Sequence, residues 1–350
     1  MKALVAEGPH KAAFRDVELR PIKDNELLIK VKRAGICATD NAIYTGDCMF
    51  VRDGSIVYPC RFGHEWSGVV EKVGKLVTNV KVGDTVCIET ATFDPLLDCS
   101  RNGRPDFDNT PCGDSFMELD KGFRTGMGFA EKAIVPASLC VKFDGMTFEE
   151  AAIMEPMGVA YDLFMTSDIK LNNDVLVLGC GPIGLMALQM AKHAGARKIY
   201  AAEFSTATAR CEMAKKFGAD EIIYTDKVKL EDYEFEKGGV DRVLVTAPPK
   251  TIGSACNVCN TGGIVSFLGI SYNEPTVTFD SNVVHLNKLQ IRGSNAIPAL
   301  YFPLCIDLVK AGIVDVKSLV SHTFELDNLP AAMEQYYKDK ATALKAVMVK

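Results

Sequence analysis

Asp-Val-Leu-Val-Leu-Gly-Cys-Gly-Pro-Ile-Gly, residues 174–184, joins a short apolar run to glycines spaced as Gly-x-Gly-x-x-Gly, and a helical pattern follows. A strand, a glycine turn and a helix in this order are typical of a dinucleotide-binding unit. Gly179 permits the tight turn, Gly181 lets the backbone approach a pyrophosphate, and Gly184 allows the helix to pack closely. The sequence therefore predicts a dinucleotide site here.

The residues after this turn indicate how the dinucleotide would be held. Pro182 and Ile183 open the helix, whose unpaired N–H groups suit phosphate. Glu203 closes the next predicted strand, 24 residues after Gly179, near the distance expected for the acid that binds the adenosine ribose. A carboxylate there accepts hydrogen bonds from two hydroxyls and repels a 2′-phosphate, so we expect NAD to be preferred over NADP. Arg210, a few positions on, weighs against this preference.

The regions around the turn differ in pattern. From residue 174 to about 268, apolar strands alternate with helices, which predicts an α/β unit with a doubly wound parallel sheet of the Rossmann type. From residue 2 to about 143, short β-branched runs broken by Gly, Pro and Asn predict an irregular β-rich domain. A Thr147 cap with Glu150 three residues on predicts a helix toward Phe164. The end of the chain returns to short strands, so we expect a first domain of residues 1–148 and 291–350 and a dinucleotide-binding domain of residues 149–290.

Composition narrows the class of protein. The 350 residues exceed what one hydrophobic core usually organises, and 48% hydrophobic with 24% charged residues is ordinary for a globular protein. The net charge of −6 comes without a cluster of Lys and Arg, so neither nucleic acid nor a membrane is expected as a partner. There is no run of about 18 apolar residues and no signal peptide pattern. The 12 cysteines are scattered, which favours a reducing cytoplasm.

Four side chains ahead of the dinucleotide turn could bind a metal. Cys37, His64, Glu65 and Glu155 supply a thiolate, an imidazole and two carboxylates. Singly each is unremarkable, because a lone cysteine is usually buried filler. Together they suit a borderline metal with sulfur, nitrogen and oxygen ligands, which can hold an alcohol oxygen while its carbon gives up hydride. The sequence therefore predicts an oxidoreductase with small-molecule substrates.

Ordered motifs along the whole chain carry a family resemblance: Gly-Ile-Cys-x-Thr-Asp at 35–40, Gly-His-Glu at 63–65, Val-Gly-Asp at 82–84, Gly-Phe-Ala-Glu at 128–131, the glycine turn, and Gly-Ser at 293–294. The chain resembles the zinc-dependent medium-chain dehydrogenase/reductase family, in its polyol and sugar branch typified by sorbitol and glucose dehydrogenases. The resemblance implies a GroES-like catalytic domain with a zinc held by Cys37, His64 and Glu65. It also implies that Glu155 ligates zinc directly or through water, and that Thr39 accepts the substrate's proton.

Two departures from the family pattern change what we expect. Many members carry a histidine five residues after the zinc cysteine, where this chain has Ala42, so the proton must leave by another route. A structural zinc needs four closely spaced cysteines, but this region offers only Cys87, Cys99 and Cys112, spaced 12 and 13 apart. We therefore expect one catalytic zinc per subunit and no structural zinc.

The charges of the metal ligands predict an exchange between two of them. Zinc with one thiolate, one neutral imidazole and one carboxylate is formally neutral, and a second carboxylate makes the site negative. A negative site is a poor host for an alkoxide. We therefore expect Glu65 and Glu155 to vary in coordination, with the displaced carboxylate or its water serving as general base.

The sequence says less about the substrate. Residues 101–124, rich in Asp, Asn, Gly and Arg, suit a polyhydroxylated substrate without choosing among linear polyols, sugars and cyclitols. A threonine or simple secondary-alcohol dehydrogenase is an alternative, and a non-catalytic nucleotide-binding protein on the same fold is another. The family implies a homodimer or homotetramer, and residues 286–295 are similar to the family segment near the nicotinamide. Cys256 and Cys259 are expected to be core or helix-face thiols.

Overall fold

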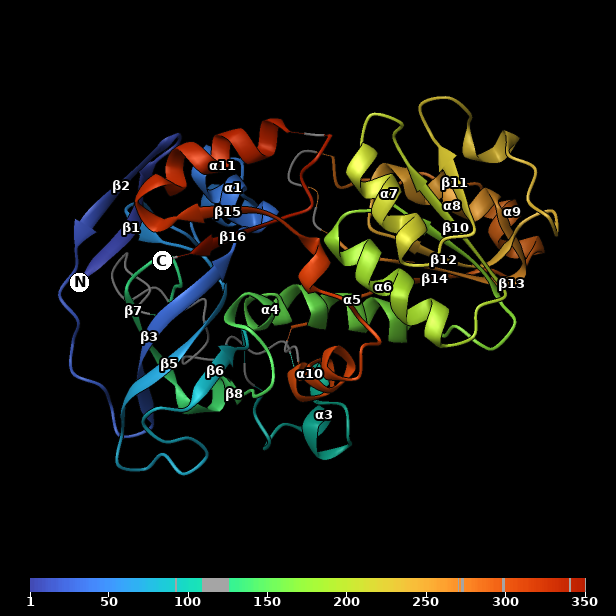
Figure 1. Ribbon diagram of the computed structural model, residues 1–350. Helices are drawn as coiled ribbons and strands as arrows, with labels where there is room; N and C mark the ends of the chain where they lie inside the picture. Colours follow the sequence, from blue (N-terminus) through green and yellow to red (C-terminus); the bar gives the residue numbers. More distant parts are fainter. Residues whose placement is uncertain are drawn as a thin grey trace.

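The computed structural model describes residues 1–91, 93–108, 126–269, 271, 274–297, 300–339 and 341–349. Its two halves lie side by side: a β-rich half, which also holds both labelled ends of the chain, and a half built on a parallel sheet (Figure 1). This arrangement confirms the predicted class, a β-rich domain combined with a doubly wound Rossmann domain.

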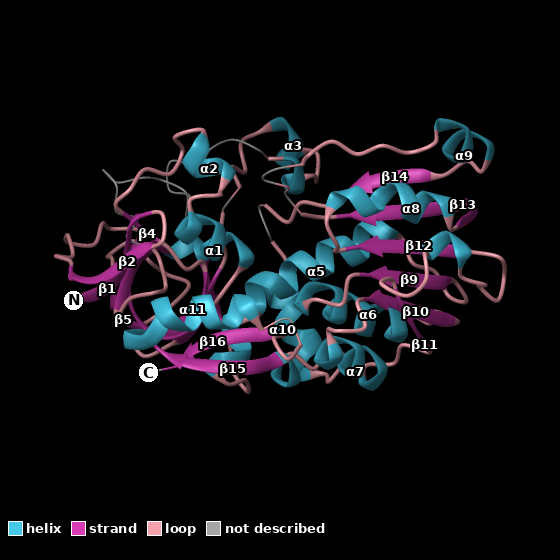
Figure 2. Ribbon diagram, turned by 90° about the horizontal axis from the view of Figure 1, so that it is seen from above, coloured by secondary structure: helices cyan, strands magenta, loops and turns pink. Residues whose placement is uncertain are grey.

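Six parallel strands form the sheet of the second half, in the order β11-β10-β9-β12-β13-β14 (Figure 2). The order reverses between β9 and β12, and in such sheets the ligand binds at this switch point, outside the carboxyl ends of the strands. The register sets Leu176 of β9 between Tyr200 and Val243. The strands are β9 (Asp174–Leu178), β10 (Lys198–Glu203), β11 (Glu221–Tyr224), β12 (Val240–Val245), β13 (Cys259–Phe267) and β14 (Gln290–Gly293).

Helices follow these strands and bury the sheet. β9 is buried at every position, as expected for a parallel strand with helices over both faces. The helices of this half are α6 (Pro182–His193), α7 (Thr208–Lys216), α8 (Ile252–Asn257) and α9 (Ser281–Leu286). Cys256 lies in α8, whereas Cys259 is the first residue of β13, so only Cys256 is helical. Both thiols are buried in the core.

The β-rich half contains a mostly antiparallel sheet in the order β15-β16-β3-β5-β6-β8, with β7 also paired to β3. Its strands are β3 (Glu26–Gly35), β5 (Glu65–Val73), β6 (Thr85–Ile88), β7 (Lys132–Pro136), β8 (Cys140–Lys142), β15 (Val320–Glu325) and β16 (Lys345–Val349). β15 and β16 come from the end of the chain, as the sequence predicts. A smaller sheet, β2-β1-β4, uses β1 (Lys2–Gly8), β2 (Lys11–Asp16) and β4 (Cys60–Arg61).

Short helices complete this half. α1 (Ala38–Thr45) and α11 (Leu329–Lys338) lie near each other, where the hydroxyl of Tyr44 donates to Glu334 at 3.2 Å. α2 (Met49–Arg52) and α3 (Asp98–Arg101) are single turns. The bounds proposed for the two domains stay a prediction. Two elements near the proposed second boundary contact the parallel-sheet half: β14 pairs with β13, and α10 (Phe302–Lys310) packs against the helices of that half.

The helix predicted at the boundary is interrupted. α4 (Phe148–Ala152) begins at Thr147, whose hydroxyl accepts the Glu150 N–H at 3.2 Å, as the capping pattern predicts. α5 (Met154–Ser167) starts after Ile153, which has ψ 0° and ends the first helix. The cause is Pro156, which has no N–H to donate to the Ala152 carbonyl and whose ring crowds that oxygen.

One apolar core crosses the boundary between the halves. It combines α5, α6 and α10 with Cys87 of β6, Phe143 and Val347 of β16. In Figures 1 and 2, α5 runs from the β-rich half toward the parallel sheet. Because α5 contacts β5 at one end and β12, β13 and β14 further on, it connects the two sheets directly.

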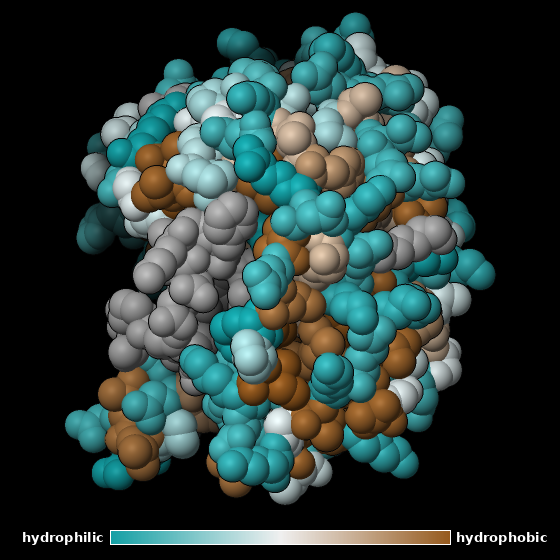
Figure 3. Space-filling view, turned by 90° about the vertical axis from the view of Figure 1, so that its left-hand side faces the viewer, coloured by the Kyte–Doolittle hydropathy of each residue, from teal (hydrophilic) through white to brown (hydrophobic). Residues whose placement is uncertain are grey.

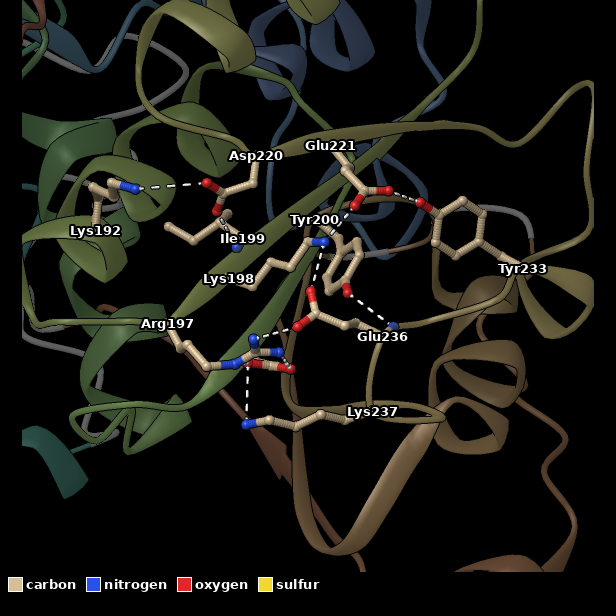
Figure 4. Close-up of polar contacts among 11 residues, drawn as sticks. Lys192, Arg197, Lys198, Ile199, Tyr200, Asp220, Glu221, Tyr233, Glu236 and Lys237 are labelled. Atoms are coloured by element: carbon tan, nitrogen blue, oxygen red, sulfur yellow. Dashed lines mark hydrogen bonds and ion pairs between the residues drawn. The ribbon is translucent and has the colours of Figure 1, made fainter.

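Charged side chains at the amino edge of the parallel sheet form a network (Figure 4). Lys198, the first residue of β10, lies 2.5 Å from a carboxylate oxygen of Glu221 and 2.9 Å from one of Glu236. Arg197 also pairs with Glu236, at 2.7 Å, and with buried Asp174. Ligands bind at the opposite, carboxyl edge of such sheets, so this network lies away from the expected dinucleotide site.

The surface of the β-rich end mixes polar and apolar residues. Figure 3 views this end, where hydrophilic side chains predominate and hydrophobic ones gather in the lower part. Exposed hydrophobic side chains of this half include Val57, Leu76 and Val82. Among the described residues, every helix is too short or too polar to cross a bilayer.

Glu89 generates a prediction about stability. It lies buried after β6, where the β-rich sheet meets α10 and the Phe302 N–H donates to it, and burial raises the pKa of its carboxyl to about 7. The native state therefore holds a proton that the unfolded chain releases, and wild-type stability should fall as pH rises from about 4.5 through 7. We expect Glu89→Gln to be more stable than wild type by about 1–3 kcal/mol at pH 8, with little difference at pH 4.5.

Urea unfolding of both proteins at several pH values measures this difference. Glu212→Gln, on the exposed face of α7, is the control and should follow wild type at every pH. A Glu89→Gln protein that loses stability at pH 8 would contradict the prediction.

Candidate metal and dinucleotide site

The pairing of β3 with β5 brings the predicted metal ligands together. In this antiparallel pair Gly35 lies opposite Glu65. Cys37 follows β3 and caps α1, while His64 directly precedes β5. As a result, one ligand atom from each of Cys37, His64 and Glu65 lies within 4.8 Å of the other two. A thiolate, an imidazole and a carboxylate this close, two of them half-buried and Glu65 fully buried, fit a zinc ion.

Asp40 orients this group. Its carboxylate is fully buried and accepts the Cys37 N–H at 2.9 Å and the Gly63 N–H at 3.1 Å, which joins α1 to the chain before β5. Its Oδ1 also lies 3.3 Å from Nδ1 of His64, leaving Nε2 for a metal. Burial alone would lower the pKa of His64, but the charges of Asp40 and Cys37 raise it well above its usual value.

Lys345 of β16 neutralises Glu65. The two side chains form an ion pair and are both nearly inaccessible, at 3% and 1% exposure. The Lys345 ammonium also donates to the Ile36 carbonyl at 3.1 Å. Burial alone would lower the pKa of Lys345, but Glu65 and then Cys37 raise it, so the lysine stays charged. Gly35 makes room for the pair, because a Cβ there would lie 2.2 Å from Glu65 Oε2.

Glu155 lies in the first turn of α5, outside the group of three ligand atoms. Burial raises the pKa of its carboxyl to about 7; His64 and Lys345 oppose this rise, whereas Glu65 and Asp40 add to it. Glu155 therefore lies close enough to the site to interact electrostatically with its charged side chains. Its ligation of zinc, and any exchange with Glu65, stay predictions.

The remaining residues near the site come from α1 and α11. Thr39 lies half-buried in the first turn of α1, and Ala42 is buried in the same helix. The Tyr337 hydroxyl, on α11, donates to the Cys37 carbonyl. Burial and then the charge of Cys37 raise the pKa of Tyr337 well above its usual value, so it remains a donor.

Sequence reasoning gave no role to Asp40, Lys345 or Tyr337. Asp40 carried a usable signal, because an acid three residues after Cys37 at a helix start is a capping pattern. Lys345 carried another, since a lone cation in the run from Leu344 to Val349 must find a partner if the strand is buried. Tyr337 carried none that we recognise.

The glycine turn has the geometry the sequence predicts. Gly179 has φ +100°, and a Cβ there would lie 2.7 Å from the Ala247 N. A Cβ at Gly184 would lie 2.1 Å from the Gly179 carbonyl oxygen, so helix and turn touch. At Gly181 no atom lies within 4 Å of such a Cβ, which leaves the open approach that a pyrophosphate needs. Thr246, the residue after β12, fixes the turn by donating to the Gly179 carbonyl at 2.6 Å.

Glu203 ends β10 beside this turn, at 9% exposure. Its carboxylate accepts the N–H groups of Cys180, at 3.1 Å, and Phe204, at 2.9 Å. Arg210 donates to the same carboxylate at 3.4 Å, and its Nε reaches the Ala343 carbonyl at 3.4 Å. The acid is thus held in one orientation, with Arg210 partly neutralising it.

Two of the three cysteines considered for a second metal lie in the described residues, on different elements. Cys87 is buried in β6 and its thiol donates to the Val141 carbonyl, whereas Cys99 is half-buried in α3. Cys112 and most of residues 101–124 lie outside the described residues. Among the described residues, the grouping of metal-ligating side chains is the one at Cys37, His64 and Glu65.

Two family descriptions match the chain: Alcohol dehydrogenase GroES-like domain over residues 23–145, and Zinc-binding dehydrogenase over residues 182–311. The L-threonine 3-dehydrogenase of Caldanaerobacter subterraneus subsp. tengcongensis is 34% identical to this chain, over 92% of this chain and 91% of its own length. The D-xylulose reductase A of Aspergillus oryzae is 26% identical, over 95% of this chain and 92% of its own.

A solved structure agrees with these matches. The alcohol dehydrogenase RspB of Escherichia coli CFT073, in complex with its cofactor NADH, is similar to this chain with a TM-score of 0.87 and 26% sequence identity. The similarity covers 100% of this chain and 99% of that chain. Both halves of the fold are therefore shared.

Gly35 generates a prediction about the metal. Gly35→Ala would force the Glu65 carboxylate away from its position beside Lys345. We expect a folded protein whose zinc dissociation constant is about 10-fold higher, because changes that misorient a ligand weaken metal binding by this order. Competition with a chromogenic chelator measures the constant.

Gly8→Ala is the matched control. No atom lies within 4 Å of a Cβ at Gly8, which ends β1, so that variant should bind zinc as wild type does. Unchanged zinc affinity in Gly35→Ala would contradict the prediction, because it would show that zinc binding does not depend on the position of the Glu65 carboxylate.

Proposed function

Because this chain belongs to the zinc-binding dehydrogenases, we propose that it transfers hydride between NAD and a secondary hydroxyl of a polyol, sugar or cyclitol. The observation that carries the proposal is the convergence of Cys37, His64 and Glu65. Glu65 lies in β5 and the other two ligands lie next to β3 and β5, in the sheet that α5 connects to the parallel sheet. Hydride transfer needs the two reacting carbons in contact, and a site between two such sheets supplies that arrangement.

Cys37, His64 and Glu65 would hold the zinc, with Glu155 as a further ligand. Zinc in such a site supplies a Lewis acid that lowers the pKa of an alcohol. Asp40 keeps the His64 ring in the orientation that a ligand needs. Lys345 offsets the charge of Glu65, which makes the site less negative than its ligands alone would.

Two residues would handle the substrate's proton. Thr39, in the first turn of α1, is the proposed hydroxyl that accepts it. Glu155 is the proposed next carrier, because its carboxyl lies in the first turn of α5 and interacts with the charges of His64 and Glu65. With Ala42 where relatives carry a histidine, a route through Glu155 and water would replace the histidine relay. Exchange of Glu65 and Glu155 as ligands is part of the same proposal.

NAD is the proposed redox partner and supplies the hydride acceptor. Gly181 leaves space for its pyrophosphate, and the first turn of α6, at Pro182 and Ile183, offers N–H groups. Glu203 would accept hydrogen bonds from the adenosine ribose while its two backbone contacts hold it in position.

The composition of residues 101–124, rich in Asp, Asn, Gly and Arg, supports a polyhydroxylated substrate. Arg104 binds Asp106 through two donors, with Nε at 2.9 Å from Oδ1, and the guanidinium lies 3.5 Å above the ring of Phe107. The 34% identity with an L-threonine 3-dehydrogenase makes L-threonine the second candidate substrate. A cytoplasmic location and a homodimer or homotetramer remain predictions from the sequence.

NADH formation against a panel of linear polyols, sugars, inositols, simple secondary alcohols and L-threonine tests the proposal. We expect the highest kcat/KM with a polyhydroxylated substrate. We also expect loss of activity after the zinc is chelated, and recovery when about one equivalent per subunit is returned.

The outcomes separate the alternatives. The highest kcat/KM with L-threonine would favour the second candidate, and full activity in a zinc-free protein would overturn the role of the metal. A protein that binds NAD but reduces it with no member of the panel would favour a non-catalytic nucleotide-binding protein.

Cofactor preference gives a separate prediction. Wild type should have a higher kcat/KM with NAD than with NADP, because Glu203 repels a 2′-phosphate. Glu203→Ser frees Arg210 from its carboxylate partner, so we expect kcat/KM to rise about 10-fold with NADP and to fall about 10-fold with NAD. Glu212→Gln, exposed on the same helix as Arg210, should leave both values unchanged. A wild-type preference for NADP would contradict this assignment.

A further inference from the structure

Asp162 lies on the helix that also carries Glu155. The two residues are seven apart, which is two helical turns, so they project from the same face of α5. Glu155 is at the metal end of α5 and Asp162 is at the part that packs against the parallel sheet. A single rigid element therefore carries both side chains.

Both carboxylate oxygens of Asp162 are engaged by residues from another part of the chain. The Ser294 hydroxyl donates to Oδ2 at 2.5 Å, and the Tyr301 hydroxyl donates to Oδ1 at 3.0 Å. Burial, and then the charge of Asp162, raise the pKa of Tyr301, so its hydroxyl remains a donor throughout the working pH range. Hydrogen bonds from hydroxyls to a carboxylate are charge-assisted and stronger than neutral ones.

Further contacts hold the same elements against α5. The ring of Tyr301 packs on that of Tyr161, with centroids 5.1 Å apart. Arg292 of β14 donates to the Thr166 carbonyl, one turn beyond Asp162, at 3.0 Å. The end of β14 and the start of α10 are thus both fixed to α5, and Asp162 is the residue that bonds both.

Ser294 has a defined place in the dinucleotide site. It follows Gly293, the last residue of β14, and its N–H donates to the Phe267 carbonyl at 2.9 Å, so it lies at the carboxyl edge of the sheet. In a sheet of this order the half that begins at β9 takes the adenosine end, where Glu203 lies. The half from β12 to β14 is left for the nicotinamide end.

We propose that Asp162 is a positioning residue that holds the nicotinamide end of the dinucleotide site in register with the metal ligands, by bonding Ser294 and Tyr301 to α5. This inference rests on the proposed function, because it takes a nicotinamide dinucleotide as the ligand. The hydrogen bonds that Asp162 accepts come from Ser294 and Tyr301. Asp162 acts through Ser294 and through the common helix.

Binding of two ligands tests the inference. NADH fills the whole site, whereas ADP-ribose has the adenosine and both phosphates without the nicotinamide. In Asp162→Ala we expect the Kd of NADH to rise about 10-fold, because Ser294 and Tyr301 lose the carboxylate that holds them against α5, while the Kd of ADP-ribose stays within about 2-fold of wild type. Titration calorimetry measures both constants.

Variants that remove one hydroxyl donor at a time, together with a control variant, test each contact separately. Ser294→Ala and Tyr301→Phe should each give part of the NADH effect, and combining either with Asp162→Ala should add little, because the partner is already lost. These two variants also test the inference if Asp162→Ala fails to fold. Asp168→Asn removes a carboxylate from the end of the same helix and should leave both constants unchanged.

The outcomes are distinct. Equal weakening of NADH and ADP-ribose would show a general loss of structure and overturn the inference, and so would unchanged NADH binding. If wild type oxidises no alcohol but the variants separate NADH from ADP-ribose binding as expected, the proposed reaction fails and the role of Asp162 stands. If wild type binds neither ligand, both are overturned.

Discussion

The antiparallel register of β3 and β5 is the constraint on which the candidate metal site depends. It sets Gly35 opposite Glu65, so Cys37 and His64, just outside the paired residues, meet on one side of the sheet. The register also brings a carboxylate into the apolar interior, where a charge without a partner is expensive. Lys345 of β16 meets that need, and the missing side chain at Gly35 gives the pair its space. The arrangement of Cys37, His64 and Glu65 therefore depends on the pairing of three strands, β3, β5 and β16.

α5 connects the strands that carry the proposed metal ligands to the parallel sheet. Its first turn carries Glu155 among the site's charges, and its later turns pack on β12, β13 and β14. The apolar core around it takes side chains from both halves of the molecule, including Cys87 and Val347. Because interiors of this density transmit displacement rather than absorb it, the distance between metal ligands and sheet edge is set by one well-packed helix.

Much of the architecture could be predicted from the sequence, because its signals are local. The apolar run before Gly179 and the glycines after it identified a strand, a turn and a helix, and the Thr147 cap marked the boundary. Cys37, His64 and Glu65 could be named together because family motifs surround each of them. Tyr337 and Asp162 could not, since their partners lie far away in the chain and no periodic pattern records a contact between distant segments. For Lys345 the sequence signals that a buried cation needs a partner, but it does not identify Glu65 as that partner. The interruption at Ile153 was missed although Pro156 was visible, because the capping pattern before it was read as the start of one continuous helix.

That interruption has a mechanical consequence. A continuous helix resists bending, since bending stretches its hydrogen bonds, but α4 and α5 meet at a residue whose backbone already departs from helical geometry. α4 and α5 are therefore two separate stiff segments that meet at Ile153, next to the β-rich sheet. Because Ile153 is buried in the apolar core that both halves share, the angle between the two segments is set by the packing around this residue and not by helical hydrogen bonds.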